Sequence, residues 1–229
     1  NIMYMDELLG ELKNRGVNIA FDEIQCGLGR TGKMFAYQHG NVSPDVVIVS
    51  KALGGGILPV SAIGYDRNTV FQHNDDFVLE NGWHSGTWPG YVLGTAVAII
   101  FLDIMQKENL VDNAARMGKH LTEVLEKHCI HEYDSRQDDL VDYCVRTGFG
   151  LMQGLEFRRW NGDPFPEWRD VVLDNLQNAE PMGILTFGAG HEKVNPVIRF
   201  EPCLTTTKEE LDYLDDTLSK VLYKNKPNR

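Results

Sequence analysis

Two short, mostly apolar runs of residues constrain the fold of this 229-residue chain more than any other feature. Residues 17–21 (VNIAF) are followed at once by Asp22, and residues 46–49 (VVIV) are followed by one serine and then by Lys51. Runs of this length and character are typical of strands buried in a parallel sheet. Ligands of open α/β sheets bind beyond the carboxyl ends of such strands, so we expect Asp22 and Lys51 to lie at a ligand-binding edge.

The rest of the chain predicts an α/β region followed by a small α+β region. Apolar spacing indicates helices over residues 5–13, 91–107, 109–129, 168–180 and 208–223, and further strands over residues 61–65, 148–157 and 197–200. Thr207 and Glu210 have the spacing of a capping box at the start of the last helix. We therefore expect one domain over residues 1–105 and a second, small α+β domain over residues 106–229.

Charge and cysteine content favour a small-molecule ligand and a reducing compartment. The formal net charge is −11, and the lysines and arginines are dispersed, whereas nucleic acids and anionic membranes require a concentrated basic surface. The four cysteines form no CxxC pair, so we expect neither a metal site nor a disulfide framework. No apolar stretch approaches the length of about twenty residues that spans a membrane, and the first residues lack the pattern of a signal peptide. We expect a cytoplasmic protein with no nucleic-acid and no membrane partner.

A glycine-rich segment at residues 27–34 (GLGRTGKM) approaches two nucleotide-binding patterns without fitting either. A P-loop requires a hydroxyl side chain where Met34 stands, because this hydroxyl binds Mg²⁺. A dinucleotide-binding fingerprint should open a long helix and lead to an acidic residue that ends the next strand, but Asp45 precedes that strand. The residues favour a glycine-rich loop, with a nucleotide-binding module over residues 27–33 as the alternative.

Asp22 and Lys51 together suit one particular kind of chemistry. A lysine amine that is removed from water is nucleophilic toward an aldehyde and forms a Schiff base with it. A carboxylate that faces a pyridine nitrogen keeps this nitrogen protonated and makes the ring an electron sink. On the residues alone, a lysine at the end of a strand is more often a solvated surface residue, so the pairing only suggests this chemistry.

Two long motifs and their spacing place this suggestion in a family. Residues 21–32 (FDEIQCGLGRTG) and 44–56 (PDVVIVSKALGGG) resemble the class III aminotransferases, the group that contains ornithine and 4-aminobutyrate aminotransferases. Further matches extend the resemblance over nearly the whole chain, at residues 84–87 (HSGT), 113–118 (NAARMG), 150–152 (GLM) and 195–202 (NPVIRFEP). The resemblance implies an α/β fold in which residues 1–105 form part of a fold-type I PLP-transferase large domain, followed by a small α+β carboxyl-terminal domain.

The resemblance also implies a cofactor, pyridoxal 5′-phosphate (PLP), and a role for each matching residue. Lys51 matches the lysine that forms the Schiff base and moves the proton, and Asp22 matches the partner of the ring nitrogen. Ile24 matches the branched residue that packs on one face of the ring, and Gln25 matches the side chain near the ring hydroxyl. These four residues are the expected cofactor site, with Lys51 and Asp22 as its catalytic residues.

Two further residues extend the implied site. Thr87 matches the residue that reaches the cofactor phosphate of the neighbouring subunit, which implies a homodimer with its sites at the subunit interface. Arg199 matches the arginine that grips a substrate carboxylate with its planar pair of donors. From the sequence alone, a helix N-cap stays an alternative for Thr87 and a surface charge stays one for Arg199, and His84 is expected to be structural.

The chain also departs from the family. Cys26 stands where a threonine or a similar small residue is usual, and Trp88 begins a stretch (WPG) that is more often rich in glycine and asparagine. No segment matches the amino-terminal part that binds the phosphate and stacks on the ring. The resemblance therefore implies an incomplete aminotransferase, which transfers an amino group from an amino acid or amine donor to a keto acid. Other PLP chemistry on the same fold (an aminomutase, racemase or decarboxylase) and a non-catalytic fragment stay open.

Overall fold

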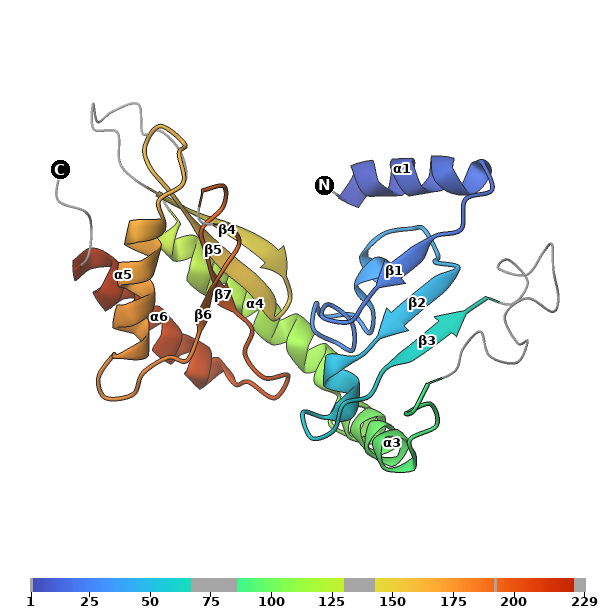
Figure 1. Cartoon of the computed structure of the whole chain (residues 1–229). Coiled ribbons are helices and arrows are strands. Elements are labelled where there is room, and N and C mark those ends of the chain that lie inside the picture. Colours follow the sequence, from blue (N-terminus) through green and yellow to red (C-terminus); the bar gives the residue numbers. More distant parts are fainter. Residues whose placement is uncertain (1, 67–85, 130–142, 192, 225–229) are drawn as a thin grey trace. The chain divides into compact units, whose positions relative to one another are not determined.

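A computed structural model describes residues 2–66, 86–129, 143–191 and 193–224 of the chain (Figure 1). The chain divides into two compact units, Asn1–Val111 and Asp112–Arg229. This division falls within the first turn of a helix that begins at Leu110, whereas the sequence places the domain boundary after residue 105. The predicted boundary between a cofactor domain and a small domain stays a prediction.

The first unit is built around a three-stranded sheet. Its helices and strands are α1 (Ile2–Asn14), β1 (Ala20–Asp22), β2 (Val46–Val49), β3 (Ala62–Tyr65) and α3 (Val92–Lys107), and two short 3-10 helices, η1 (Ala36–His39) and η2 (Lys51–Gly54), precede and follow β2. The strand order is β1-β2-β3. β1 and β2 run parallel, with Asp22 opposite Ile48, and β3 is antiparallel to β2.

The predicted parallel pairing of the two apolar runs is confirmed, although β1 is shorter than its run. The N–H of Ile19 donates to Oδ2 of Asp45 (2.7 Å), so this amide bonds to a side chain and the strand begins only at Ala20. The four residues of β2 are half-buried, whereas the sequence predicts a buried strand. The reason lies in the helix packing, because α3 packs mainly against η2 and not over the strands.

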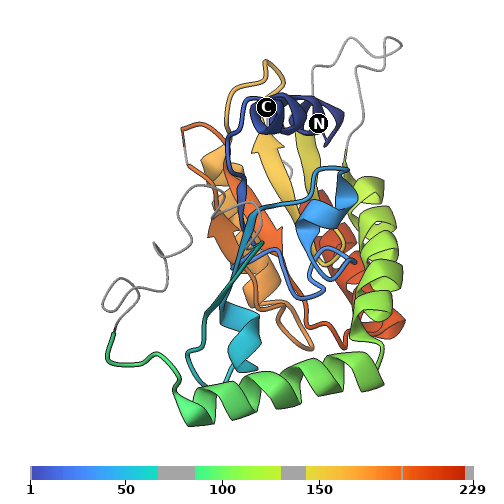
Figure 2. The same ribbon diagram turned by 90° about the vertical axis from the view of Figure 1, so that its right-hand side faces the viewer.

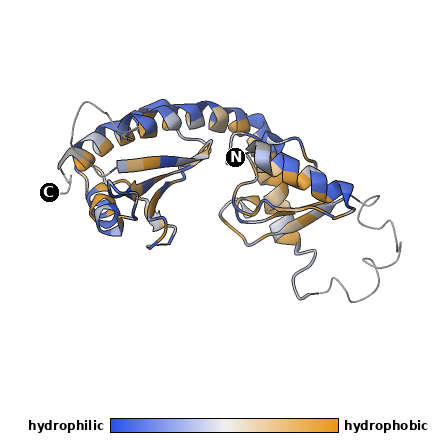
Figure 3. Cartoon of the chain, turned by 90° about the horizontal axis from the view of Figure 1, so that it is seen from above, coloured by the Kyte–Doolittle hydropathy of each residue, from blue (hydrophilic) through white to orange (hydrophobic). Residues whose placement is uncertain are grey.

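Helix α3 confirms the apolar helix predicted over residues 91–107. A Cβ atom at Gly94 would lie 2.7 Å from Cγ2 of Val60, so the glycine lets α3 approach the loop after η2 closely. Other positions of α3 expose large apolar side chains, including Ile99 and Ile100. Figure 3 shows the hydropathy of each residue along the ribbon of both units. Within the described residues, no helix combines the length and the apolar character needed to cross a membrane.

The second unit is an α+β structure with a four-stranded antiparallel sheet, ordered β4-β5-β7-β6 (Figure 2). Its elements are α4 (Leu110–His128), β4 (Tyr143–Phe149), β5 (Met152–Arg158), α5 (Pro166–Gln177), β6 (Phe187–Ala189), β7 (Val197–Phe200) and α6 (Lys208–Lys224). Leu155 and Phe157 of β5 are buried beside Ile198 and Phe200 of β7. These side chains form one core with residues of all three helices.

The sequence predicts most of these elements and misses the hairpin between β4 and β5. The single strand predicted over residues 148–157 is wrong, because Gly148 and Gly150 adopt positive φ angles and the chain turns between Phe149 and Met152. The short strand β6 is not predicted either. The capping box of α6 is confirmed, since the N–H of Thr207 donates to Oε2 of Glu210 (2.9 Å) and the N–H of Glu210 donates to Oγ1 of Thr207 (3.3 Å).

Candidate active site

Asp22 and Lys51 lie at the same end of the first unit's sheet, where the parallel strands β1 and β2 end. Asp22 is the last residue of β1 and lies opposite Ile48 of β2, and Lys51 begins η2 shortly after β2 ends. Because β1 and β2 are parallel, both residues follow the carboxyl ends of neighbouring strands, where ligands of α/β sheets bind. This is the placement that the sequence predicts.

A turn after β1 brings two more predicted residues to this edge. Oδ1 of Asp22 accepts a hydrogen bond from the N–H of Ile24 (3.0 Å), a pattern that aspartate side chains form in tight turns. Ile24 and Gln25 are half-buried. Nζ of Lys51 donates to Oε1 of Gln25 (3.3 Å). The structure therefore gathers four of the five predicted cofactor contacts in one small region, and the fifth, Thr87, lies elsewhere in the first unit.

Lys51 has an unusual backbone conformation for a residue with a side chain. Its φ angle is 41°, in the left-handed region that few non-glycine residues adopt. Conformations of this kind cost about 1–3 kcal/mol and cluster at active sites. The side chain is exposed, whereas the sequence predicts an amine held at a buried strand end. Lys51 is the first residue of η2, after the end of β2.

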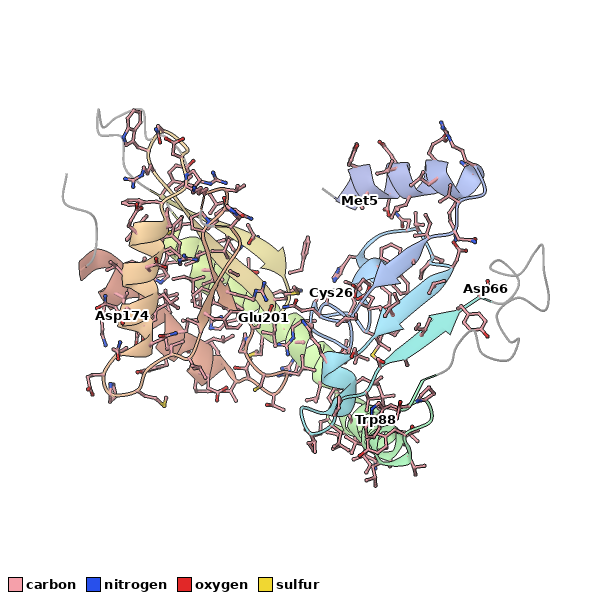
Figure 4. All side chains as sticks on the ribbon, viewed as in Figure 1. Met5, Cys26, Asp66, Trp88, Asp174 and Glu201 are labelled. Carbon is pink, nitrogen blue, oxygen red and sulfur yellow. The ribbon has the colours of Figure 1, made fainter. Side chains whose placement is uncertain are left out.

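Cys26 lies in the same turn, beside a buried carboxylate (Figure 4). Its Sγ donates a hydrogen bond to Oε2 of Glu23 (3.2 Å). Burial first, and then this hydrogen bond and the negative charge of Glu23, raise the pKa of Cys26 to about 12. Because the thiolate is the reactive form of cysteine, this raised pKa favours the less reactive protonated form of Cys26 at neutral pH.

Glu23 is a residue of this region that the sequence does not distinguish from its neighbour Asp22. Glu23 is only 1% exposed, and its carboxylate accepts hydrogen bonds from the N–H groups of Ala36 (2.9 Å) and Tyr37 (2.8 Å). The sequence shows two adjacent acids at a strand end. Which of them faces inward depends on the pairing of β1, and the local pattern carries no sign of it.

The glycine-rich segment forms a loop without the features of either nucleotide-binding pattern. The helix that follows it, η1, has only four residues, whereas both patterns open a long helix. The N–H of Gly29 donates to the carbonyl oxygen of Met34 (3.2 Å), so this amide closes the loop itself. Nζ of Lys33 donates to the carbonyl oxygen of Gln38 (2.7 Å). These contacts favour the loop over the nucleotide-binding alternative.

Thr87 lies in the segment that precedes α3. It is exposed, and the N-cap of α3 is Tyr91, so Thr87 does not cap this helix. The predicted role of Thr87 toward a neighbouring subunit stays a prediction. His84, which the sequence assigns a structural role, lies outside the described residues.

Arg199 belongs to the second unit and lies in β7. Its Nε is 3.5 Å from Oε1 of Glu201, and its Cζ is 5.2 Å from the ring centroid of Phe187. The substrate-binding role of Arg199 also stays a prediction. In the part of the chain that the structure describes, no three metal-ligating side chains are grouped so that they could hold an ion.

Comparisons with known proteins agree with the motifs. The profile of the family described as Aminotransferase class-III matches residues 3–222. A curated relative, the ornithine aminotransferase of Brevibacillus brevis, is 35% identical over 211 residues, which cover 92% of this chain and 45% of the relative. The LysW-aminoadipate semialdehyde/glutamate semialdehyde transaminase of Sulfolobus acidocaldarius is 33% identical over 224 residues, 98% of this chain and 50% of the relative.

Solved structures share the fold. A crystal structure of a Bacillus anthracis aminotransferase gives a TM-score of 0.80 at 25% identity, over 96% of this chain and 48% of that one. The structure of the ornithine aminotransferase of Toxoplasma gondii, with PLP at partial occupancy in its active site, gives a TM-score of 0.77 at 26% identity. The match covers 98% of this chain and 47% of that one. The predicted α/β, fold-type I architecture is thereby confirmed, and this chain spans about half the length of the curated relatives it matches. The chain belongs to the class III aminotransferases, which use PLP.

Proposed function

We propose that this chain supplies the lysine-bearing half of a PLP-dependent aminotransferase site. The reaction moves an amino group from an amino acid or amine donor to a keto acid. The observation that carries this proposal is the arrangement at the edge of the β1-β2-β3 sheet, where Lys51 contacts Gln25 and Asp22 ends the neighbouring parallel strand. The family match supports it.

The side chains at this edge fit PLP by their chemistry. Lys51 offers an amine for the aldehyde, and Asp22 offers an exposed carboxylate for the protonated ring nitrogen. Ile24 offers a half-buried apolar surface for one ring face. The amide of Gln25, 3.3 Å from the lysine amine, offers a hydrogen-bonding group for the ring hydroxyl.

Each residue has a separate task in the proposed reaction. When bound, PLP supplies an electron sink for negative charge at the amine-bearing carbon of the substrate. Nζ of Lys51 would hold the cofactor at its aldehyde and would be the base that takes the proton from that carbon. Oε1 of Gln25 accepts a hydrogen bond from Nζ and restricts the direction of the amine. Asp22 holds the proton on the ring nitrogen.

Other parts of the proposal concern a second subunit and the second unit of the chain. Thr87 binds the cofactor phosphate of a second subunit in a homodimer, and Arg199 binds a substrate carboxylate after exchanging its contact with Glu201. We place the protein in the cytoplasm, which agrees with the free thiols of its cysteines. Because the chain spans about half of its curated relatives, we expect it to bind PLP weakly unless the other half is supplied.

The proposal is tested by trapping PLP on the chain with borohydride and mapping the labelled peptide. We expect the label on Lys51 and its loss in Lys51→Ala. Lys33→Ala is the matched control, because Nζ of Lys33 bonds to the carbonyl oxygen of Gln38 and should not take the label. A label that stays on another lysine while Lys51 is untouched contradicts the assignment.

A second measurement separates amino transfer from other PLP chemistry. The chain is mixed with its amino-terminal complement from a relative, PLP and an amino donor. Aminotransferase chemistry releases a keto product and leaves pyridoxamine phosphate, whereas an aminomutase, racemase or decarboxylase does not give this pair of products as its main outcome.

A further inference from the structure

The main chain of Glu23 holds both ends of the turn that follows β1. Its N–H donates to the carbonyl oxygen of Ile48 (2.9 Å), which extends the pairing of β1 with β2 past Asp22. Its carbonyl oxygen accepts a hydrogen bond from the N–H of Gly27 (3.0 Å). A Cβ atom at Gly27 would lie 2.7 Å from this oxygen, so a glycine is needed for the turn to close so tightly. Gln25 lies inside this closed turn.

The carboxylate of Glu23 ties the same turn to a segment much later in the chain. Oε1 accepts a hydrogen bond from the N–H of Tyr37 (2.8 Å), and Oε2 accepts from the N–H of Ala36 (2.9 Å) and from Sγ of Cys26 (3.2 Å). Glu23 is almost completely buried. Burying a carboxylate is costly unless it is hydrogen-bonded, and hydrogen bonds to a charged acceptor are the stronger kind. The carboxylate therefore depends on these donors and also holds them in place.

The hydrogen bonds of Glu23 together form a clamp on the turn after β1, and this clamp affects two residues of the proposed site. Neighbouring residues of a strand direct their side chains to opposite faces, and accordingly Glu23 is buried while Asp22 is exposed. Because the two residues share a peptide bond, a shift of Glu23 is expected to move Asp22 as well. Gln25, two residues further on, accepts the hydrogen bond from Lys51, so the same shift moves the contact of the amine.

We propose that Glu23 is a positioning residue, which holds Asp22 and Gln25 in place by clamping the turn after β1 to the start of η1. The inference rests on the proposed function, because it concerns the geometry of that site. In this proposal the buried Glu23 acts through these two residues and has no contact of its own with the substrate or the cofactor.

The test compares Glu23→Gln with a matched control, Asp45→Asn. Asp45 is also a buried acid of the first unit (3% exposed) and accepts a hydrogen bond from the N–H of Ile19 (2.7 Å). It precedes β2, whereas Lys51 follows β2, so it lies at the other end of the strands. Both variants remove one buried negative charge and are expected to unfold more easily. Glu23→Asp keeps the charge and is expected to restore part of each effect below.

The first measurement needs no cofactor. After burial, the hydrogen bond and the charge of Glu23 contribute to the raised pKa of Cys26. Glu23→Gln should therefore lower this pKa and speed the alkylation of Cys26 by iodoacetamide, about tenfold for each pKa unit when the pH is well below the pKa. Peptide mass spectrometry reports the rate for Cys26 alone. An unchanged rate in Glu23→Gln, or an equal increase in Asp45→Asn, overturns the proposal.

The second measurement distinguishes positioning from a structural role. The full chain is mixed with excess PLP, and the absorbance of the bound cofactor is followed as a function of pH. A displaced Asp22 changes the hold on the ring proton, so Glu23→Gln should shift the midpoint of this titration toward the value in Asp22→Asn. A lower stability alone leaves the midpoint unchanged, as expected for Asp45→Asn. A parental midpoint in Glu23→Gln overturns the proposal.

The two proposals fail in different ways. If Asp22→Asn and Lys51→Ala bind and titrate PLP as the parent chain does, the proposed function is wrong. The alkylation of Cys26 still decides in that case whether Glu23 clamps the turn, because it is measured without PLP.

Discussion

Replacing Gly118 by alanine is expected to force helix α4 away from the turn between β4 and β5. A Cβ atom at position 118 would lie 2.4 Å from Cα of Gly150 and 2.6 Å from its carbonyl carbon. Carbon atoms in favourable contact are about 3.5–4.0 Å apart, so the helix or the turn must move by roughly 1 Å. The atoms in the way belong to the backbone and cannot rotate aside as a side chain would.

The same movement strains a buried hydrogen-bond network. Gln153 is 2% exposed, and its Nε2 donates to the carbonyl oxygens of Gly118 (2.9 Å) and Gly150 (2.7 Å). Overpacking costs about 1–3 kcal/mol, and a weakened buried hydrogen bond adds about 1 kcal/mol. The higher helix propensity of alanine returns about 1 kcal/mol. We expect Gly118→Ala to lower the free energy of unfolding by about 1–3 kcal/mol.

Urea unfolding followed by circular dichroism measures this change, with Gly10→Ala as the control. Gly10 lies in α1, and no atom within 4 Å would meet its Cβ, so alanine there should raise the stability by up to about 1 kcal/mol. If Gly118→Ala is as stable as Gly10→Ala, the close approach of α4 to the hairpin turn is refuted.

Three further predictions follow from single contacts. Burial opposes the ionisation of Asp215, but hydrogen bonds from Lys127 and the adjacent histidine outweigh it and lower its pKa. The stabilisation by Asp215 is therefore fully present above the pKa that this group has in the unfolded chain, and it is lost as the pH falls through the lower pKa of the folded chain. The unfolding midpoint of Asp215→Asn should consequently vary less with acid pH than that of the parent. Thr207→Ala removes one half of the capping box and should cost about 1 kcal/mol in urea unfolding, and no loss would contradict the cap. Iodoacetamide at neutral pH should alkylate the exposed Cys203 much faster than Cys26, whose pKa is about 12, and equal rates by peptide mapping would speak against the buried contact.

The strands that carry the site were predictable because their signal is local. Residues 46–49 are four consecutive apolar residues with polar neighbours, and β2 has these bounds. β1 is shorter than its run because the amide of Ile19 bonds to Asp45, a residue far along the chain that no local pattern links to it. The turn between β4 and β5 escaped prediction because Gly148 and Gly150 read as small members of a strand until their φ angles are known.

The site shows the same division between local and long-range causes. The motif around Asp22 and Lys51 was sufficient to place both residues at one edge of the sheet. The exposure of Lys51 could not be predicted, because burial depends on packing between distant segments and not on the local motif. The burial of Glu23 depends on amides at Ala36 and Tyr37, and only the folded chain brings these amides to it.

At Lys51, the left-handed backbone conformation lowers the stability of the fold, while the side chain supplies the amine for the proposed chemistry. Glycine and asparagine adopt positive φ angles more readily than lysine, so a chain selected for stability alone would discard the amine at this position. Such a chain would be more stable and would lack the amine of the proposed site. If Lys51 has the proposed role, its replacement would therefore remove activity without damage to the fold, and a lysine kept at this position would indicate selection for function.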